Sequence, residues 1–287
     1  MINADNIKFR SSSMGHLMTD PRSKKEELSE SCITHLVDLF VQHKYGRKEF
    51  ITSKYLEKGN EREEHAIGLL SFLTQIEYTK NTERLQNEFI QGEPDLFNGE
   101  SIFNAKRILD IKTSWSTHTF FRTKNKPVDK MYYWQGQCYM DLTGADYHSV
   151  VFCLVNGTAK AIMDEKRMAG YYYGVLDPSN TTNEEYKERC RQIEINHIVD
   201  LDSFQEEYPF YDFDNDLSQW KYTIPYEDRM FQFHFERNQE DIGRMHKKVE
   251  KCREFMNKVL FKVEDKDYAE MIKKGNALRE LLKKSLN

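Results

Sequence analysis

The sequence predicts an α/β protein with a central mixed β-sheet flanked by helices. Two observations carry this prediction: helical spacing of apolar residues alternates with short β-type segments, and the order along the chain is helix, strand meander, charged strand, helix, buried strand. With 287 residues, 39% hydrophobic and 13% aromatic, the chain can form a packed core. We expect a core over residues 1–175 and an extension over residues 176–287 packed on it, making one compact domain overall.

The N-terminal third is predicted to be mainly helical. Apolar residues recur with helical spacing over 32–46 and 54–75. Before them, either Ser12 or Ser13 can cap a short helix. In the helix over 54–75, counting back from the apolar stripe places Glu63 on the inward face. A carboxylate aimed inward is either salt-bridged or bound to a metal ion.

Short β-segments are expected between residues 76 and 113, including one at 101–103. The last of them contains ILDIKTSW, and side chains in a strand alternate between its two faces. Asp110 and Lys112 therefore share one face, while Ile111 points to the other. The simplest explanation of such a strand is an edge strand with a solvated face.

The remaining elements follow the same reasoning. The apolar stripe of the last helix has spacings of three and four, which favours a helix packed on the protein over a coiled-coil partner helix. The segments are a helix at 131–145, strands at 148–157 and 168–176, a polar helix at 183–201, an acidic aromatic loop at 208–220, a strand at 231–235 and a helix at 242–259.

Composition excludes several classes of protein. The formal net charge is −5, so any contact with DNA needs a local basic patch. The five cysteines are scattered without C-x-x-C spacing, which argues against a disulfide framework, a zinc ribbon or an iron-sulfur cluster. The sequence contains no P-loop. It has neither a membrane-length apolar run nor a signal-peptide core, so we expect an intracellular, cytoplasmic protein.

Two further motifs carry polar groups toward the charged strand. In QGEPDLFNG, a bend precedes Asp95, and this aspartate either forms an ordinary turn or enters a hairpin strand that brings it close to Asp110. On the helix that follows, Gln135 and Tyr139 are four residues apart and share one face.

Taken in order, the Glu63 helix, G-E-P-D, D-I-K and Q-x-x-x-Y resemble the PD-(D/E)XK nuclease superfamily, within it the branch of phage lambda exonuclease and the YqaJ-type viral recombinase nucleases. The stretch from Ser12 to Ser23 is similar to the start of those proteins. The resemblance covers residues 8 to about 160 and implies a restriction-endonuclease-like core.

The resemblance also implies a metal-dependent hydrolysis. Hard oxygen ligands select Mg²⁺ or Mn²⁺, as one or two ions. The expected ligands are Glu63, Asp95, Asp110 and the carbonyl of Ile111. Lys112 would hold the attacking water and offset charge on the phosphate. Gln135 would orient the lysine or the water, with Tyr139 beside it.

Candidate DNA contacts come from basic and aromatic residues. Where the lambda enzyme has an arginine after its serine, this chain has Ser13, so Arg10 or Arg22 would have to anchor a phosphate instead. The helix start at Ser12 and Ser13 could receive a terminal phosphate. Trp115, Phe120 and Phe121 either stack on a base or fill the core, and the core is favoured. The proposed basic patch consists of Arg122, Lys124, Lys126 and Lys130, with Lys106 and Arg107 nearby.

These features together predict a phage-type 5′-to-3′ exonuclease acting on double-stranded DNA ends and leaving 3′ single-stranded tails for an annealing protein. By resemblance the assembly would be a homo-oligomer, a ring-shaped trimer. Two alternatives stay open: a structure-specific or restriction-like endonuclease on the same core, and a non-catalytic DNA-binding subunit.

Overall fold

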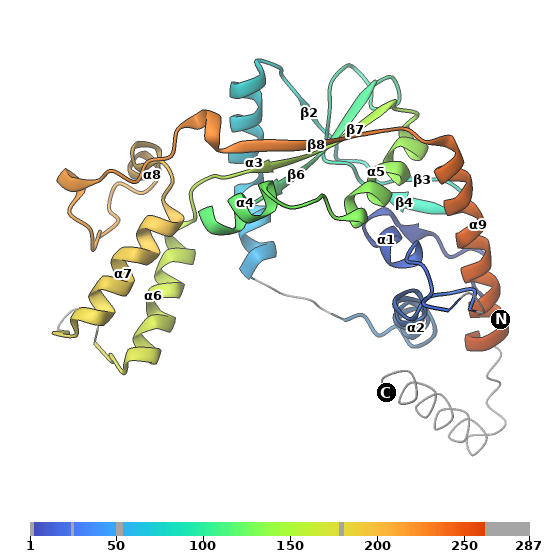
Figure 1. Ribbon diagram of the computed structural model, residues 1–287, viewed down its shortest axis with the longest axis horizontal. Coiled ribbons are helices and arrows are strands. Elements are labelled where there is room, and N and C mark those ends of the chain that lie inside the picture. Colours follow the sequence, from blue (N-terminus) through green and yellow to red (C-terminus); the bar gives the residue numbers. More distant parts are fainter. Residues whose placement is uncertain (1–2, 24–25, 50–53, 178–180, 262–287) are drawn as a thin grey trace.

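The protein, analysed as a computed structural model that describes residues 3–23, 26–49, 54–177 and 181–261, is built on a five-stranded mixed sheet flanked by helices (Figure 1). This confirms the predicted fold class. The strand order is β2-β5-β6-β7-β8, in which only β6 and β7 are parallel. The strands are β2 Thr79–Lys80, β5 Leu96–Phe97, β6 Arg107–Thr113, β7 Tyr147–Cys153 and β8 Met230–Glu236.

The charged strand β6 lies in the middle of this sheet, so the edge-strand explanation is wrong. Its two faces differ as predicted. Leu109 and Ile111 pack against α3 (Lys54–Thr74), in one cluster with Leu70. Ile108, on the opposite face, belongs to a cluster with Met140 of α5 (Lys130–Thr143). Asp110 is only 1% exposed, which means that a charged group is held inside the protein.

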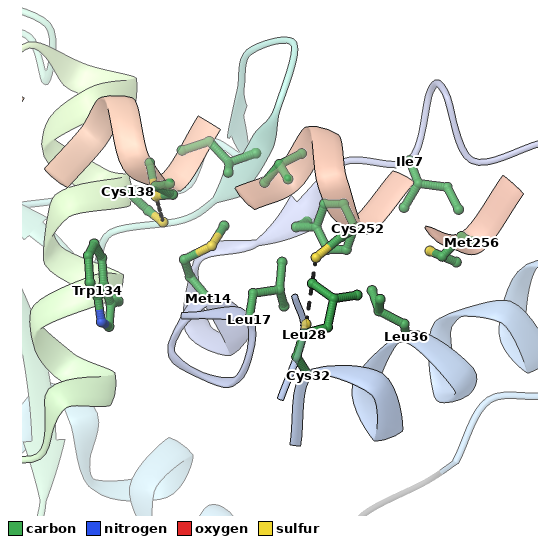
Figure 2. Close-up of a cluster of buried hydrophobic side chains, with 14 of the residues drawn as sticks. Ile7, Met14, Leu17, Leu28, Cys32, Leu36, Trp134, Cys138, Cys252 and Met256 are labelled. Carbon is green, nitrogen blue, oxygen red and sulfur yellow. Dashed lines mark hydrogen bonds between the residues drawn. The ribbon is translucent and has the colours of Figure 1, made fainter. Parts of the chain in front are cut away.

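A second core joins the two ends of the described chain. It contains side chains from α1 (Met14–Leu17), α2 (Glu30–Tyr45) and α9 (Gln239–Phe255). Figure 2 shows Cys32 and Cys252 facing each other there, with their sulfur atoms 3.6 Å apart. The predicted packing helix is confirmed, because its stripe from Ile242 to Met256 is buried; Val259, beyond it, is 46% exposed. The helix continues as η5 Met256–Phe261.

A small three-stranded sheet lies beside this core, in the order β1-β4-β3. A separate sheet was not expected, although β3 and β4 fall in the range 76–113 where short β-segments were predicted; its strands are two or three residues long. The guanidinium of Arg253 ties α9 to it by donating to the carbonyls of Ile7 and Glu88. The strands are β1 Phe9–Arg10, β3 Leu85–Gln86 and β4 Ile90–Gly92, and η1 Ser11–Ser13 follows β1.

At the other end of the sheet, α6 and α7 form a helical hairpin that projects from the molecule (Figure 1). Glu194 of α7 is fully buried, where Lys166 of α6 pairs with it at 2.6 Å. This side of the molecule contains α4 Thr117–Lys124, α6 Ala159–Tyr173, α7 Glu184–His197, α8 Leu201–Glu207, η3 Leu217–Gln219 and η4 Tyr226–Asp228.

Several local predictions are corrected by the structure. Residues 168–176 do not form a strand: the Thr158 side chain caps α6, and the helix runs through the tyrosines until Gly174, whose φ is 67°. Residues 101–103 form a turn. Neither Ser12 nor Ser13 caps a helix by a side-chain hydrogen bond.

The described residues include no helix with the length and apolar character needed to cross a bilayer.

Candidate active site

The candidate site is organised by the pairing of β5 with β6. In this antiparallel pair Leu96 lies opposite Leu109, which places Asp95 across from Asp110. The backbone N–H of Ile111 donates to Oδ2 of Asp95 at 2.7 Å. The predicted proximity of the two aspartates is therefore confirmed, and the backbone of the central strand fixes one of them in place.

Asp110 is held from two directions. The side-chain amide of Gln135, on α5, donates to its Oδ1 at 3.1 Å. The ammonium of Lys112 forms an ion pair with its Oδ2 and lies 3.3 Å from the carbonyl oxygen of Ile111. The Asp110 carboxylate, the Ile111 carbonyl and the Lys112 ammonium therefore lie together. Side chains alternate along the strand, which places Lys112 on the same face as Asp110.

Helix α5 supplies the support behind Asp110. The Gln135 amide also donates to the Tyr139 hydroxyl at 2.9 Å, and that hydroxyl donates to the carbonyl of Glu93 at 3.3 Å. A Cβ on Gly136 would lie 2.4 Å from the His148 ring, so only glycine lets α5 approach β7 this closely. Burial lowers the pKa of His148 to about 4, so this imidazole is neutral at physiological pH.

The pKa shifts of Asp95 and Lys112 indicate that the candidate site carries excess negative charge. Burial, reinforced by the Asp110 charge, raises the pKa of Asp95 to about 7, although Lys112 and the Ile111 N–H act against the shift. Burial opposes the charged form of Lys112, but the carboxylates of Asp110 and Asp95 outweigh it and raise the pKa of the ammonium. One lysine therefore balances two adjacent carboxylates.

Of the two alternatives for Glu63, the structure shows the salt bridge. Its carboxylate pairs with Lys80 of β2 at 2.8 Å, and the neighbouring Glu64 pairs with the same lysine at 2.6 Å. Its charge still contributes to the raised pKa of Asp95. In the part of the chain that the structure describes, no three Asp, Glu, His or Cys side chains form a ready-made metal site. A three-carboxylate site would require Glu63 to leave Lys80.

We call Asp95, Asp110, the Ile111 carbonyl and Lys112 the inner groups, and their oxygen atoms nevertheless suit a divalent cation. Asp95, Asp110 and the Ile111 carbonyl are oxygen donors of the type that Mg²⁺ and Mn²⁺ prefer. The Lys112 ammonium already contacts two of these groups as a cation. The raised pKa of Asp95 indicates that positive charge at this place would be stabilising.

Sequence reasoning missed two buried cations on α3. Lys58 is 2% exposed and Arg62 is 1% exposed. Arg62 pairs with Glu207 at 2.7 Å and donates to the Tyr208 hydroxyl at 2.5 Å, which ties α3 to α8. The signal was present in the spacing, since both residues continue the stripe of Ala66 back by steps of four.

The candidate DNA-binding residues do not form one cluster of contacts. Arg122 and Lys124 of the predicted basic patch are exposed on α4, and Lys126 follows them in a loop. Arg10, Ser12 and Arg22 are exposed on the N-terminal segment, and Lys106, Arg107 and Lys130 are exposed as well.

Ser13, a further candidate, is hydrogen-bonded within its own segment. The hydroxyl of Ser13 donates to the carbonyl of Arg10 at 3.2 Å. The helix that follows has only four residues, too short for a phosphate site at its N-terminus. Buried Ser11, not predicted, donates to the carbonyl of Gln91 at 3.0 Å and so ties this segment to β4.

The fold is similar to that of several solved exonuclease structures. A phage-related exonuclease from Haemophilus somnus 129PT superposes with a TM-score of 0.61 at 22% identity, over 90% of this chain and 97% of that chain. The alkaline exonuclease LHK-Exo from Laribacter hongkongensis superposes with a TM-score of 0.52 at 15% identity, over 91% of this chain and 97% of that chain. The structure of LHK-Exo in complex with dAMP superposes with a TM-score of 0.51 at 16% identity, over 90% of this chain and 95% of that chain.

The chain has the fold of these exonucleases. The resemblance to lambda-exonuclease-type nucleases, drawn from short motifs, is thereby confirmed at the level of fold. No protein-family model and no curated protein sequence matches the chain.

Proposed function

We propose that this protein is a metal-dependent deoxyribonuclease that hydrolyses phosphodiester bonds. One observation carries the proposal: Asp95 and Asp110 lie across from each other on adjacent strands, with Lys112 paired to Asp110 and the Ile111 carbonyl beside it. The same fold in a phage-related exonuclease and an alkaline exonuclease supports it.

In this proposal each residue has a defined task. Asp95, Asp110 and the Ile111 carbonyl would hold Mg²⁺ or Mn²⁺, and Glu63 would join them after release from Lys80. Such an ion lowers the pKa of a bound water and neutralises the leaving oxygen. With Asp110 bound to the ion, Lys112 would be free to hold the attacking water and to offset phosphate charge.

The support around the inner groups has a second role. Gln135 keeps Oδ1 of Asp110 oriented, and Tyr139 keeps Gln135 oriented through its hydroxyl. Fixed donors around a ligand carboxylate reduce the reorganisation needed when the reaction begins. Lys112 is also the one cation among these inner groups, so its removal would leave two carboxylates unbalanced.

We further propose that the reaction is a 5′-to-3′ exonuclease reaction on duplex ends, leaving 3′ single strands for an annealing protein. The names of the structural neighbours support the exonuclease class over an endonuclease. A homo-oligomeric ring, a trimer, would collect basic side chains from several subunits around the DNA, which suits a chain with net charge −5. Light scattering of the purified protein tests this assembly.

The deciding experiment is a time course on linear duplex labelled at the 5′ or 3′ end, compared with closed circular duplex. With Mg²⁺ or Mn²⁺ we expect mononucleotides from the 5′ end and an intact circle; EDTA and Asp110→Asn should each abolish product. Cleavage of the circle would favour the endonuclease alternative. Binding of DNA without any cleavage would favour the non-catalytic subunit.

A further inference from the structure

A cavity of about 530 Å³ lies next to the candidate active site. Its lining comes from α3, from α6 with one residue of α7, and from the segment that follows β6. Its size falls in the range of small-molecule and cofactor sites. The roles proposed above for the active-site residues make no use of it.

The cavity and the active site share two chain segments. Trp115 lines the cavity and follows Lys112 by three residues, a separation of about 10 Å when the chain is extended. Glu61 lines it from α3, two residues before Glu63. The cavity therefore lies within reach of a nucleotide close to the phosphate being cut.

Trp115 is held in a fixed orientation. The buried ammonium of Lys58 donates to the backbone carbonyls of Ser114 at 2.9 Å and of Trp115 at 2.8 Å. The same ammonium lies 5.8 Å from the centre of the indole ring. The His197 ring packs against the indole edge to face, 5.0 Å away between ring centres. Three contacts thus orient an aromatic ring that is only partly buried, which corrects the expectation that Trp115 fills the core.

The opposite wall is also aromatic and is open to solvent. Tyr172 of α6 is 83% exposed and Met168 is 64% exposed, and both line the cavity. Large apolar side chains exposed around a concave site commonly mark a binding surface. By contrast, Phe120 is fully buried in a core cluster, as the core prediction expected for that residue.

The polar lining favours a nucleobase over a bare phosphate. Lys160 and Arg189 contribute donors, while Asp164 and Glu165 contribute acceptors, so the cavity carries both signs of charge. Asp164 is paired with Arg167 at 2.8 Å, and Glu165 lies 3.3 Å from the His197 ring nitrogen, so each acceptor already has one partner in the protein. A phosphate would need an excess of cations, whereas a base presents donors and acceptors at its edge and a flat face for stacking.

We propose that this cavity receives an unpaired nucleobase of the DNA strand being cut and stacks it on Trp115. The proposal rests on the nuclease function proposed above and adds a base-binding site to it. It also gives the duplex end a reason to open, because a base can enter a protein pocket only after it leaves the stack.

Binding measurements test the site independently of cleavage. In Asp110→Asn protein without metal, we expect Trp115→Ala to weaken binding of a fluorescent single-stranded oligonucleotide by roughly 5- to 100-fold, the range measured for loss of one stacked base. Trp115→Phe should retain most of the affinity. Tyr171→Ala serves as the control, since Tyr171 is exposed on α6 and does not line the cavity.

A double-mutant comparison decides whether a base is bound. In a series of oligonucleotides that each carry one abasic residue at a different position, we expect one oligonucleotide to bind the protein with Trp115 more weakly than the others do. For that oligonucleotide, Trp115→Ala should cause no further loss of affinity. Additive losses at every position would overturn the proposal, as would equal binding of all the oligonucleotides. If the natural protein cleaves no DNA in the time course, that result counts against the nuclease function, whereas this binding result stands.

Discussion

Replacing Asp95 by asparagine should stabilise the metal-free protein and remove its activity. The folded protein raises the pKa of this carboxyl from 3.8 to about 7, chiefly through burial and the charge of Asp110. A raised pKa contributes stability that is complete below the unfolded value and is lost as the pH rises to the folded value. Asparagine avoids this loss, and its carbonyl oxygen can still accept the N–H of Ile111.

The magnitude follows from the size of the shift. About three pH units at about 1.36 kcal/mol each give at most about 4 kcal/mol. The difference in unfolding free energy between Asp95→Asn and the natural protein should therefore be near zero at pH 4, increase up to pH 7 and stay constant above it. With Mg²⁺ present, only the natural protein should gain stability, because ligand binding to the folded state stabilises it.

Urea denaturation followed by tryptophan fluorescence in EDTA, at pH 4, 5, 6, 7 and 8, measures this difference. Asp20→Asn, at an exposed aspartate, is the matched control and should show no trend with pH. A difference that is the same at every pH would refute the idea that Asp95 is a buried acid awaiting a cation.

Four other substitutions test separate parts of the structure. Lys112→Ala should reduce cleavage on the order of 10²- to 10³-fold in a gel assay while DNA binding changes little. Gln135→Leu removes the amide that donates to Asp110 and should reduce kcat roughly 10- to 100-fold with a smaller effect on KM. Arg62→Ala should lower the unfolding free energy by about 2 to 4 kcal/mol, whereas Arg167→Ala, at an exposed ion pair, should change it by less than about 1. Lys124→Ala should reduce the slope of log affinity against log salt concentration by about 1 if this side chain contacts a phosphate.

The arrangement on β6 could be predicted because it depends on local rules. Strand alternation placed Asp110 and Lys112 on one face, and the bend before Asp95 placed this residue at the entry to a paired strand. Both inferences need only neighbouring residues. The alternative of a solvated edge strand is wrong, because Asp110 is satisfied by Gln135 and Lys112 inside the protein.

The features that could not be predicted depend on distant partners. Arg62 is buried because Glu207, 145 residues later, pairs with it, and no local pattern reveals such a partner. The inward face of α3 was therefore located from its apolar residues alone, which shifted Glu63 toward the core. Similarly, Glu63 finds Lys80 only when β2 is in place beside α3.

The second core has a consequence for biosynthesis. Met14 and Leu17 bury themselves against α9, and Arg253 donates to the carbonyl of Ile7 across 246 positions of sequence. During translation the chain emerges N-terminal end first, so these early residues have no partner until nearly the whole described chain has left the ribosome. This half of the molecule therefore assembles only after α9 has emerged, and until then the apolar residues of α1 and α2 that pack on it stay exposed.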